Sequence, residues 1–162
     1  MSPTPYGSRA EPVTQPQPKS LRRSRSRKLR IIPLGGLGEI GMNMMIFEYG
    51  EDMFVVDCGQ TFPDEELLGI DLVIPDISYV LENRARFRGI IITHAHEDHI
   101  GGLPYLLDEV RAPVYGTALT IGLVQEKLKE FDLDTSVEFI TVAPKDVVQI
   151  GAVEIEFIFE AK

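Results

Sequence analysis

The fold of this chain is decided by residues 89–102, which read GIIITHAHEDHIGG. Residues 90–93 are apolar or β-branched and predict a buried strand, whereas residues 100–107 can begin a helix. Between these elements lie the residues that could bind a metal ion: His94, His96, Asp98 and His99. The chain has no histidine outside this run. The potential ligands therefore follow the carboxyl end of a strand, where α/β proteins usually place their chemistry.

The spacing of these side chains suits a pair of metal ions. Side chains alternate along an extended segment, so His94 and His96 point to one side and can reach a single ion. Asp98 and His99 follow where the chain turns, and they can face a second ion. Neutral imidazole and carboxylate are ligands that zinc, manganese and iron accept. Two ions about 3.5–4 Å apart can hold a bridging hydroxide and clamp a phosphate. A solvated histidine-rich loop is the alternative.

Charge is unevenly distributed along the 162 residues, whose net charge is −9. Residues 1–30 hold eight Lys or Arg and one acidic residue, which leaves eight basic and 24 acidic residues, a net charge of −16, for the remainder. An acidic body suits cation binding. The single cysteine, Cys58, excludes an internal disulfide, fits a reducing compartment, and is interpreted as a small buried apolar residue rather than a nucleophile. No apolar run has the length of a membrane span.

The first residues of the chain differ in composition from the rest. Residues 1–28 are rich in Pro, Ser, Gln and Arg and predict a disordered basic tail. Its segment 22–28, RRSRSRK, could contact RNA phosphates, although a solvated tail is the simpler interpretation. A start rich in Arg and Ser and poor in acids also fits an organelle transit peptide, which is a minor alternative.

Hydrophobic patterns predict mixed secondary structure after the tail. Strands are expected over residues 29–34, 44–47, 53–57, 90–93, 113–115, 137–142, 147–150 and 153–159. Helices are expected over residues 76–82, 100–107 and 118–130, with Asp76 and Thr117 as N-caps. The glycine-rich residues 35–41 fit a tight turn better than a dinucleotide loop, because they lack the GxGxxG spacing and no helix follows. Three arginines are interpreted as part of a solvated loop: Arg84, Arg86 and Arg88.

The HxHxDH pattern after an apolar strand resembles the metallo-β-lactamase superfamily. The resemblance implies that His94 and His96 bind one ion and that Asp98 and His99 bind the other. Asp98 would also orient the attacking water, so Asp98 and His99 are the candidate catalytic residues. An aspartate at the end of the preceding strand commonly supports this loop, which makes Asp57 the candidate for fixing the tautomer of a liganding histidine.

The same resemblance implies an α/β fold, a four-layer αββα sandwich, of which residues 29–162 would form a partial domain, its N-terminal half. The family needs another histidine, a bridging aspartate and often a last histidine, but this chain has no histidine after His99. The metal site is therefore expected to be incomplete, and the chain to be an N-terminal fragment that is inactive on its own.

Three segments narrow the resemblance to ribonuclease J: residues 33–43 (PLGGLGEIGMN), 69–79 (GIDLVIPDISY) and 93–105 (THAHEDHIGGLPY). Met42 departs from the family, which often has Lys there. The resemblance implies a ribonuclease with endonuclease and 5′-to-3′ exonuclease activity in RNA maturation and decay, which hydrolyses phosphodiesters with hydroxide held by two Zn²⁺ ions. Mn²⁺ and Mg²⁺ are alternative metals. A structural Ca²⁺ at the Gly69 carbonyl and Asp71 is also implied, with an exposed acidic loop as the equal alternative.

By the same resemblance, the full-length protein is expected to be a cytoplasmic homo-oligomer that acts on RNA and does not enter membranes. Two other functions stay open. One is a different hydrolase of the metallo-β-lactamase fold, acting on a thioester or lactam, against which residues 35–43 argue. The other is a truncated, non-catalytic product that binds metal or RNA.

Overall fold

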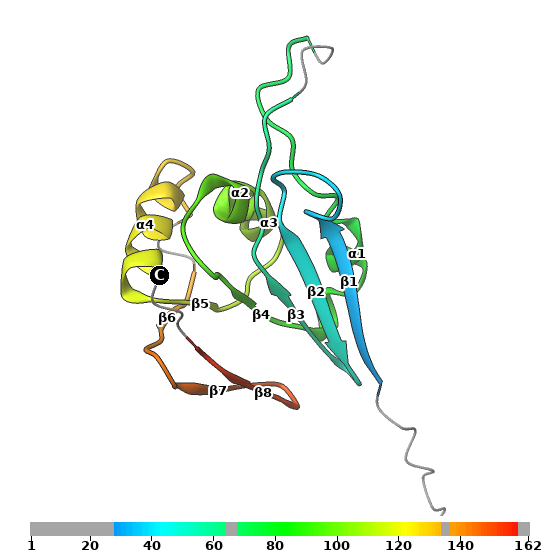
Figure 1. Ribbon diagram of the computed structural model, residues 1–162, viewed down its shortest axis with the longest axis vertical. Coiled ribbons are helices and arrows are strands. Elements are labelled where there is room, and N and C mark those ends of the chain that lie inside the picture. The colour runs from blue at the N-terminus through cyan, green and yellow to red at the C-terminus, as the bar shows by residue number, and fades with distance from the viewer. Residues whose placement is uncertain (1–27, 64–67, 134–136, 159–162) are drawn as a thin grey trace, which may run out of the picture.

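The computed structural model describes residues 28–63, 68–133 and 137–158, and its centre is a six-stranded mixed sheet (Figure 1). The strands lie side by side in chain order: β1 (Leu29–Gly35), β2 (Met44–Tyr49), β3 (Asp52–Val56), β4 (Phe87–Ile91), β5 (Val114–Gly116) and β6 (Phe139–Thr141). Pairing is antiparallel from β1 to β3 and parallel from β3 to β6. The carboxyl ends of β3 and β4 therefore meet at the same end of the sheet.

Helices cover one face of this sheet. They are α1 (Ser78–Glu82), α2 (Glu97–Ile100), α3 (Leu103–Glu109) and α4 (Ala118–Lys129), with one 3₁₀ turn, η1 (Arg84–Arg86), after α1. Their apolar side chains and those of the sheet form one buried cluster, in which Val80 and Leu106 have no exposed surface. In α4 the positions Ile121, Val124 and Leu128 are buried at helical spacing, so the predicted apolar face of this helix is confirmed.

The opposite face of the sheet is partly covered by a hairpin formed by β7 (Val147–Ile150) and β8 (Val153–Glu156). A second buried cluster joins Phe54 and Tyr115 of the sheet to Ile150 of the hairpin. The alternation expected in β8 is confirmed, because its apolar residues are half-buried and its glutamates are exposed. A helix layer, a six-stranded sheet and a two-stranded second sheet confirm the α/β class.

Asp52 in β3 links the hairpin to the central sheet. Its Oδ2 atom accepts a hydrogen bond from the backbone N–H of Ala152 at 2.9 Å, across 100 residues of sequence. Its Oδ1 atom accepts from Nε of Arg88 at 2.7 Å. The hairpin turn needs a glycine, because Gly151 has φ of +58° and a Cβ there would overlap the Asp52 carboxyl group.

The interpretation of Arg84, Arg86 and Arg88 as a solvated loop is wrong for Arg86, which is half-buried in η1, and partly wrong for Arg88, which is exposed but lies in β4. Arg86 pairs with Glu48, whose side chain is only 2% exposed, at 3.1 Å, and Arg88 pairs with Asp52. Arg84 is exposed, as expected. Sequence alone hid these pairs because the acidic partners lie 36 and 38 residues earlier and meet the arginines only when β2 to β4 assemble.

The single helix expected over residues 100–107 is two helices, α2 and α3, and the first begins at Glu97. Gly101 and Gly102 separate them, and both glycines contact the segment that follows β3. A Cβ at Gly101 would overlap the Gln60 side chain, and one at Gly102 would lie 2.6 Å from the Gly59 carbonyl oxygen. The chain therefore turns here to let two backbones approach closely.

Other expected boundaries need small corrections. Thr117 caps α4 as predicted, because its hydroxyl accepts from the Thr120 N–H at 3.2 Å. The N-cap of α1 is Ile77 rather than Asp76, although the Asp76 carboxylate accepts from the Ser78 N–H at 2.9 Å. The side chain of Ser78, followed by its backbone N–H, lowers the pKa of Asp76. Strands β4, β6 and β8 end one to three residues earlier than expected. The predicted tail, except Lys28, lies outside the described residues.

Candidate metal centre

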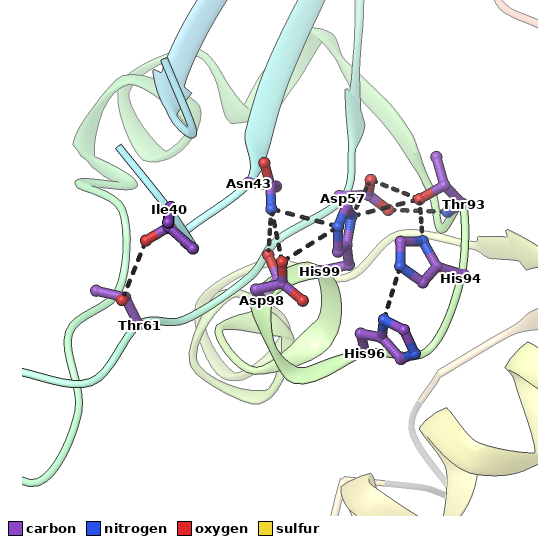
Figure 2. Close-up of polar contacts among 9 residues, drawn as sticks. All are labelled: Ile40, Asn43, Asp57, Thr61, Thr93, His94, His96, Asp98 and His99. Atoms are coloured by element: carbon purple, nitrogen blue, oxygen red, sulfur yellow. Dashed lines mark hydrogen bonds and ion pairs between the residues drawn. The ribbon is translucent and has the colours of Figure 1, made fainter. Parts of the chain in front are cut away.

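The four predicted ligands lie where β4 leaves the sheet. Because β3 and β4 are parallel neighbours, with Val56 opposite Ile91, the residues after both strands come together. The Asp57 N–H continues the pairing by donating to the Ile91 carbonyl at 2.8 Å. Figure 2 shows Asp57 beside Thr93, at the start of residues 93–99, which we call the ligand-bearing loop.

The four side chains form two adjacent donor pairs. Nε2 of His94 lies 3.1 Å from Nδ1 of His96, and Nε2 of His99 lies 3.5 Å from Oδ2 of Asp98 (Figure 2). Two ligands on a tetrahedral zinc ion, at about 2.0–2.1 Å from it, are separated by about 3.3 Å. Both pairs have nearly this separation. The His94 and His99 ring centroids are 3.9 Å apart, so the two pairs are neighbours.

The donors are grouped two and two. Among the residues that the structure describes, no group of three or more His, Cys, Asp or Glu side chains is arranged to hold an ion. A catalytic zinc ion usually has three protein ligands. Each pair therefore fits an ion by donor type and separation, and each needs at least one further donor.

Asp57 sets the orientation of His99 from behind. It is 5% exposed, and its carboxylate accepts from the Thr93 N–H at 2.8 Å, from the Thr93 hydroxyl at 2.7 Å and from Nδ1 of His99 at 2.8 Å. A carboxylate only accepts, so Nδ1 of His99 carries the proton and its Nε2 lone pair faces Asp98. Asp57 has φ of +60°, a left-handed conformation that aspartate tolerates better than most residues.

Thr93 does for His94 what Asp57 does for His99. The Thr93 hydroxyl donates its one hydrogen to Asp57, so it accepts from Nδ1 of His94 at 3.0 Å. The Nε2 lone pair of His94 is then directed at His96. Burial, followed by the nearby His99 and His96, lowers the pKa of His94, which favours the neutral form that binds metals.

The segment after β3 supports the ligand-bearing loop along its length. The Cys58 N–H donates to the His99 carbonyl at 2.8 Å, and the Gln60 N–H donates to the Glu97 carbonyl at 3.0 Å. A Cβ at Gly59 would overlap the Asp98 carbonyl, so this position needs glycine. Cys58 is fully buried, and burial raises its pKa to about 12, which agrees with its interpretation as a small apolar residue.

A cavity of about 190 Å³ opens beside the His94–His96 pair and is lined by those two residues with Ala95, Leu119, Thr120 and Leu123. The loop is also tied to α4, because Nζ of Lys127 donates to the Glu97 carboxylate at 2.8 Å. The candidate calcium ligands are elsewhere. Gly69, with φ of +83°, and Asp71 are both exposed on the loop before α1.

Sequence reasoning missed two residues of this centre, Thr93 and Asn43. Asn43 precedes β2, and its side-chain amide lies within hydrogen-bond distance of both Asp98 and His99. Both residues fall inside the segments that resemble ribonuclease J, which was the available signal. Their contacts depend on how β2, β3 and β4 are placed.

A sheet flanked by helices, with histidine and carboxylate donors at the carboxyl end of a parallel strand, is typical of a metal-dependent hydrolase. Residues 37–160 match the metallo-beta-lactamase superfamily, and the chain belongs to that superfamily. It is 48% identical over 138 residues to Ribonuclease J 2 of Staphylococcus aureus (strain MRSA252), a match that covers 85% of this chain and 25% of that protein. The resemblance to ribonuclease J is thereby confirmed. The chain spans about a quarter of the length of the curated relatives that it matches.

Solved structures show the same fold. The subclass B3 metallo-beta-lactamase MEM-A1, from a soil metagenome library, superposes with a TM-score of 0.52 at 18% identity, over 74% of this chain and 46% of its own. The metallo-beta-lactamase fold protein YhfI from Bacillus subtilis gives 0.51 at 19% identity, over 80% and 52%. At these identities the likeness concerns the fold alone. Within the described residues, no helix is long and apolar enough to cross a membrane.

Proposed function

We propose that this chain supplies the metal-binding part of a ribonuclease of the ribonuclease J type, which hydrolyses RNA phosphodiesters. The observation that carries the proposal is the geometry of the two donor pairs, whose separations of 3.1 and 3.5 Å are close to those on a tetrahedral ion. The identity to Ribonuclease J 2 supports RNA as the substrate.

In this proposal each side chain has a distinct role. His94 and His96 hold one zinc ion, and Asp98 and His99 hold the other. Asp57 and Thr93 keep the Nε2 lone pairs of His99 and His94 directed at those positions through the hydrogen bonds described above. When bound, a pair of divalent ions activates water and stabilises charge on the attacking and leaving oxygens. Asp98 orients the water, so Asp98 and His99 act as the catalytic residues.

Further parts of the proposal rest on the relatedness to ribonuclease J. They are combined endonuclease and 5′-to-3′ exonuclease activity in RNA maturation and decay, a homo-oligomeric cytoplasmic protein, and a structural Ca²⁺ at Gly69 and Asp71. Oxygen donors suit Ca²⁺, and both residues are exposed to solvent. Manganese or magnesium are alternative metals at the donor pairs.

The test uses the gene product that contains this chain, loaded with zinc. We expect cleavage of a 5′-monophosphorylated RNA, no hydrolysis of a thioester or β-lactam, and loss of RNA cleavage in His96→Ala. Asn83→Ala is the matched control, because Asn83 bonds to the Tyr79 carbonyl in α1 and not to the donor pairs. Thioester or lactam hydrolysis without RNA cleavage would instead identify another hydrolase of this fold. Zinc binding with neither activity would identify a non-catalytic metal-binding protein.

A further inference from the structure

Asn43, in the turn before β2, makes three hydrogen bonds to the ligand-bearing loop and one to the segment after β3. Two of them are backbone hydrogen bonds: the Asn43 N–H donates to the Asp98 carbonyl at 3.0 Å, and the Asn43 carbonyl accepts from the Gly59 N–H at 3.0 Å. The other two come from the side chain, whose Nδ2 donates to the Asp98 carbonyl at 3.1 Å and to the Asp98 carboxylate at 3.2 Å. The backbone alone thus holds Asn43 against the loop.

The Asn43 amide also lies 3.3 Å from Nε2 of His99. Because Asp57 accepts the Nδ1 proton of His99, this Nε2 has a lone pair. The two hydrogens of the Asn43 amide go to the carbonyl and the carboxylate of Asp98, so the lone pair of His99 stays available to a metal ion. All neighbours of the amide nitrogen at this point are acceptors: the Asp98 carbonyl, the Asp98 carboxylate and Nε2 of His99. Rotating the amide would direct its oxygen at the same three acceptors, so the NH₂ group must face the donor pair.

The amide nitrogen, Oδ2 of Asp98 and Nε2 of His99 form a nearly equilateral triangle, with sides of 3.2, 3.3 and 3.5 Å. The Asn43 amide thereby holds the carboxylate of Asp98 beside Nε2 of His99. Without that donor, the carboxylate of Asp98, which is 40% exposed, is free to turn toward water.

We propose that Asn43 is a positioning residue, whose side-chain amide keeps Asp98 and His99 arranged as a ready-made donor pair for a metal ion. The inference rests on the proposed metal site and adds a residue to it. Asn43 does not bind the metal itself. It restricts the carboxylate and the imidazole to one relative arrangement, so that less freedom is lost when an ion binds.

The experiment measures the zinc affinity of the gene product that contains this chain by isothermal titration, and follows unfolding of the metal-free protein by circular dichroism. The variant is Asn43→Ala, and Asn83→Ala is the control, because it also removes an asparagine amide bonded to a backbone carbonyl. We expect Asn43→Ala to weaken zinc binding about tenfold. We expect the two variants to lower the melting temperature of the metal-free chain equally. A purely structural role would lower that temperature and leave zinc affinity unchanged, which would overturn the proposal.

Three additional variants make the outcomes separable. Asn43→Leu keeps the branched shape of the side chain and removes its hydrogen-bonding groups, so it tests the same point if Asn43→Ala does not fold. His99→Ala and His94→Ala report on the donor pairs themselves. If both histidine variants lose zinc affinity and neither Asn43 variant does, only the role of Asn43 is refuted. If the unsubstituted gene product takes up no zinc, or the histidine variants bind it normally, the proposed metal site fails and the role of Asn43 fails with it.

Discussion

Nδ1 of His99 lies 2.8 Å from Oδ2 of Asp57, a buried carboxylate 42 residues earlier in the chain. This contact selects the tautomer of His99 and directs its other nitrogen toward Asp98. The same carboxylate binds both the N–H and the hydroxyl of Thr93, and the hydroxyl orients His94. One buried side chain thus orients a histidine from each donor pair.

Replacing Asp57 with Asn tests that arrangement. An amide can donate as well as accept, so it permits the other His99 tautomer, in which Nε2 is protonated and cannot bind a metal. We expect zinc affinity to fall about 10–100-fold, as measured by titration calorimetry. Asp108→Asn, on the exposed surface of α3, is the control and should bind zinc normally. Equal affinities in the two variants would show that Asp57 does not act on the donor pairs.

Gly59 and Gly122 provide a matched pair of glycine substitutions. A Cβ at Gly59 would overlap the Asp98 carbonyl, so we expect Gly59→Ala to displace the ligand-bearing loop and lower the free energy of unfolding by about 1–3 kcal/mol. A Cβ at Gly122, inside α4, meets nothing within 4 Å. Gly122→Ala should therefore raise that free energy by about 0.5–1 kcal/mol, because alanine favours a helix interior. Chemical denaturation measures both, and a Gly59→Ala protein as stable as the original would contradict the close approach.

Glu48 is the buried acidic side chain of β2, and three groups donate to it. Arg30 lies at 2.6 Å, the Tyr79 hydroxyl at 2.9 Å and Arg86 at 3.1 Å. Removing Glu48 leaves Arg86 without its anion in a partly buried position, so we expect Glu48→Ala to cost about 3 kcal/mol of unfolding free energy.

The matched variant for Glu48 is Arg30→Ala. The Arg30 side chain is 59% exposed, and pairs that are open to water contribute about 1 kcal/mol or less. Urea unfolding of the two variants should show this difference. If Arg30→Ala lowers the free energy of unfolding as much as Glu48→Ala does, the exposed Arg30 pair contributes more than a solvated ion pair should, and the expected difference is contradicted.

Cys58 predicts a dependence of stability on alkaline pH. Its pKa is raised to about 12 in the folded chain by burial, and by the neighbouring Asp57, from the ordinary value of 9.0. Between these values the unfolded thiol loses its proton and the folded one keeps it, so stability falls as pH rises above about 9. Cys58→Ala should remove this fall. In the original protein, a thiol reagent at pH 8 should modify Cys58 only after denaturation, and fast labelling of the folded chain would contradict the burial.

Much of the fold could be predicted because it depends on local patterns. The apolar run before His94, the alternation in β8 and the helical spacing in α4 each appear within a few residues, and each element formed near its expected place. The boundaries of helices and strands were less predictable where a segment distant in the sequence packs against them. The break between α2 and α3 follows from contact with residues 59 and 60, which no local pattern contains.

By itself, the sequence determined the identity and spacing of the candidate metal donors, because His94, His96, Asp98 and His99 lie within six residues and need only a strand end to gather them. The tertiary structure decided how those donors are oriented. Asp57 and Asn43 reach His99 across 42 and 56 residues, and Asp52 reaches the hairpin across 100. Such contacts depend on which strands become neighbours, and strand order is set by burial of the whole sheet between its helices and the hairpin rather than by any short segment.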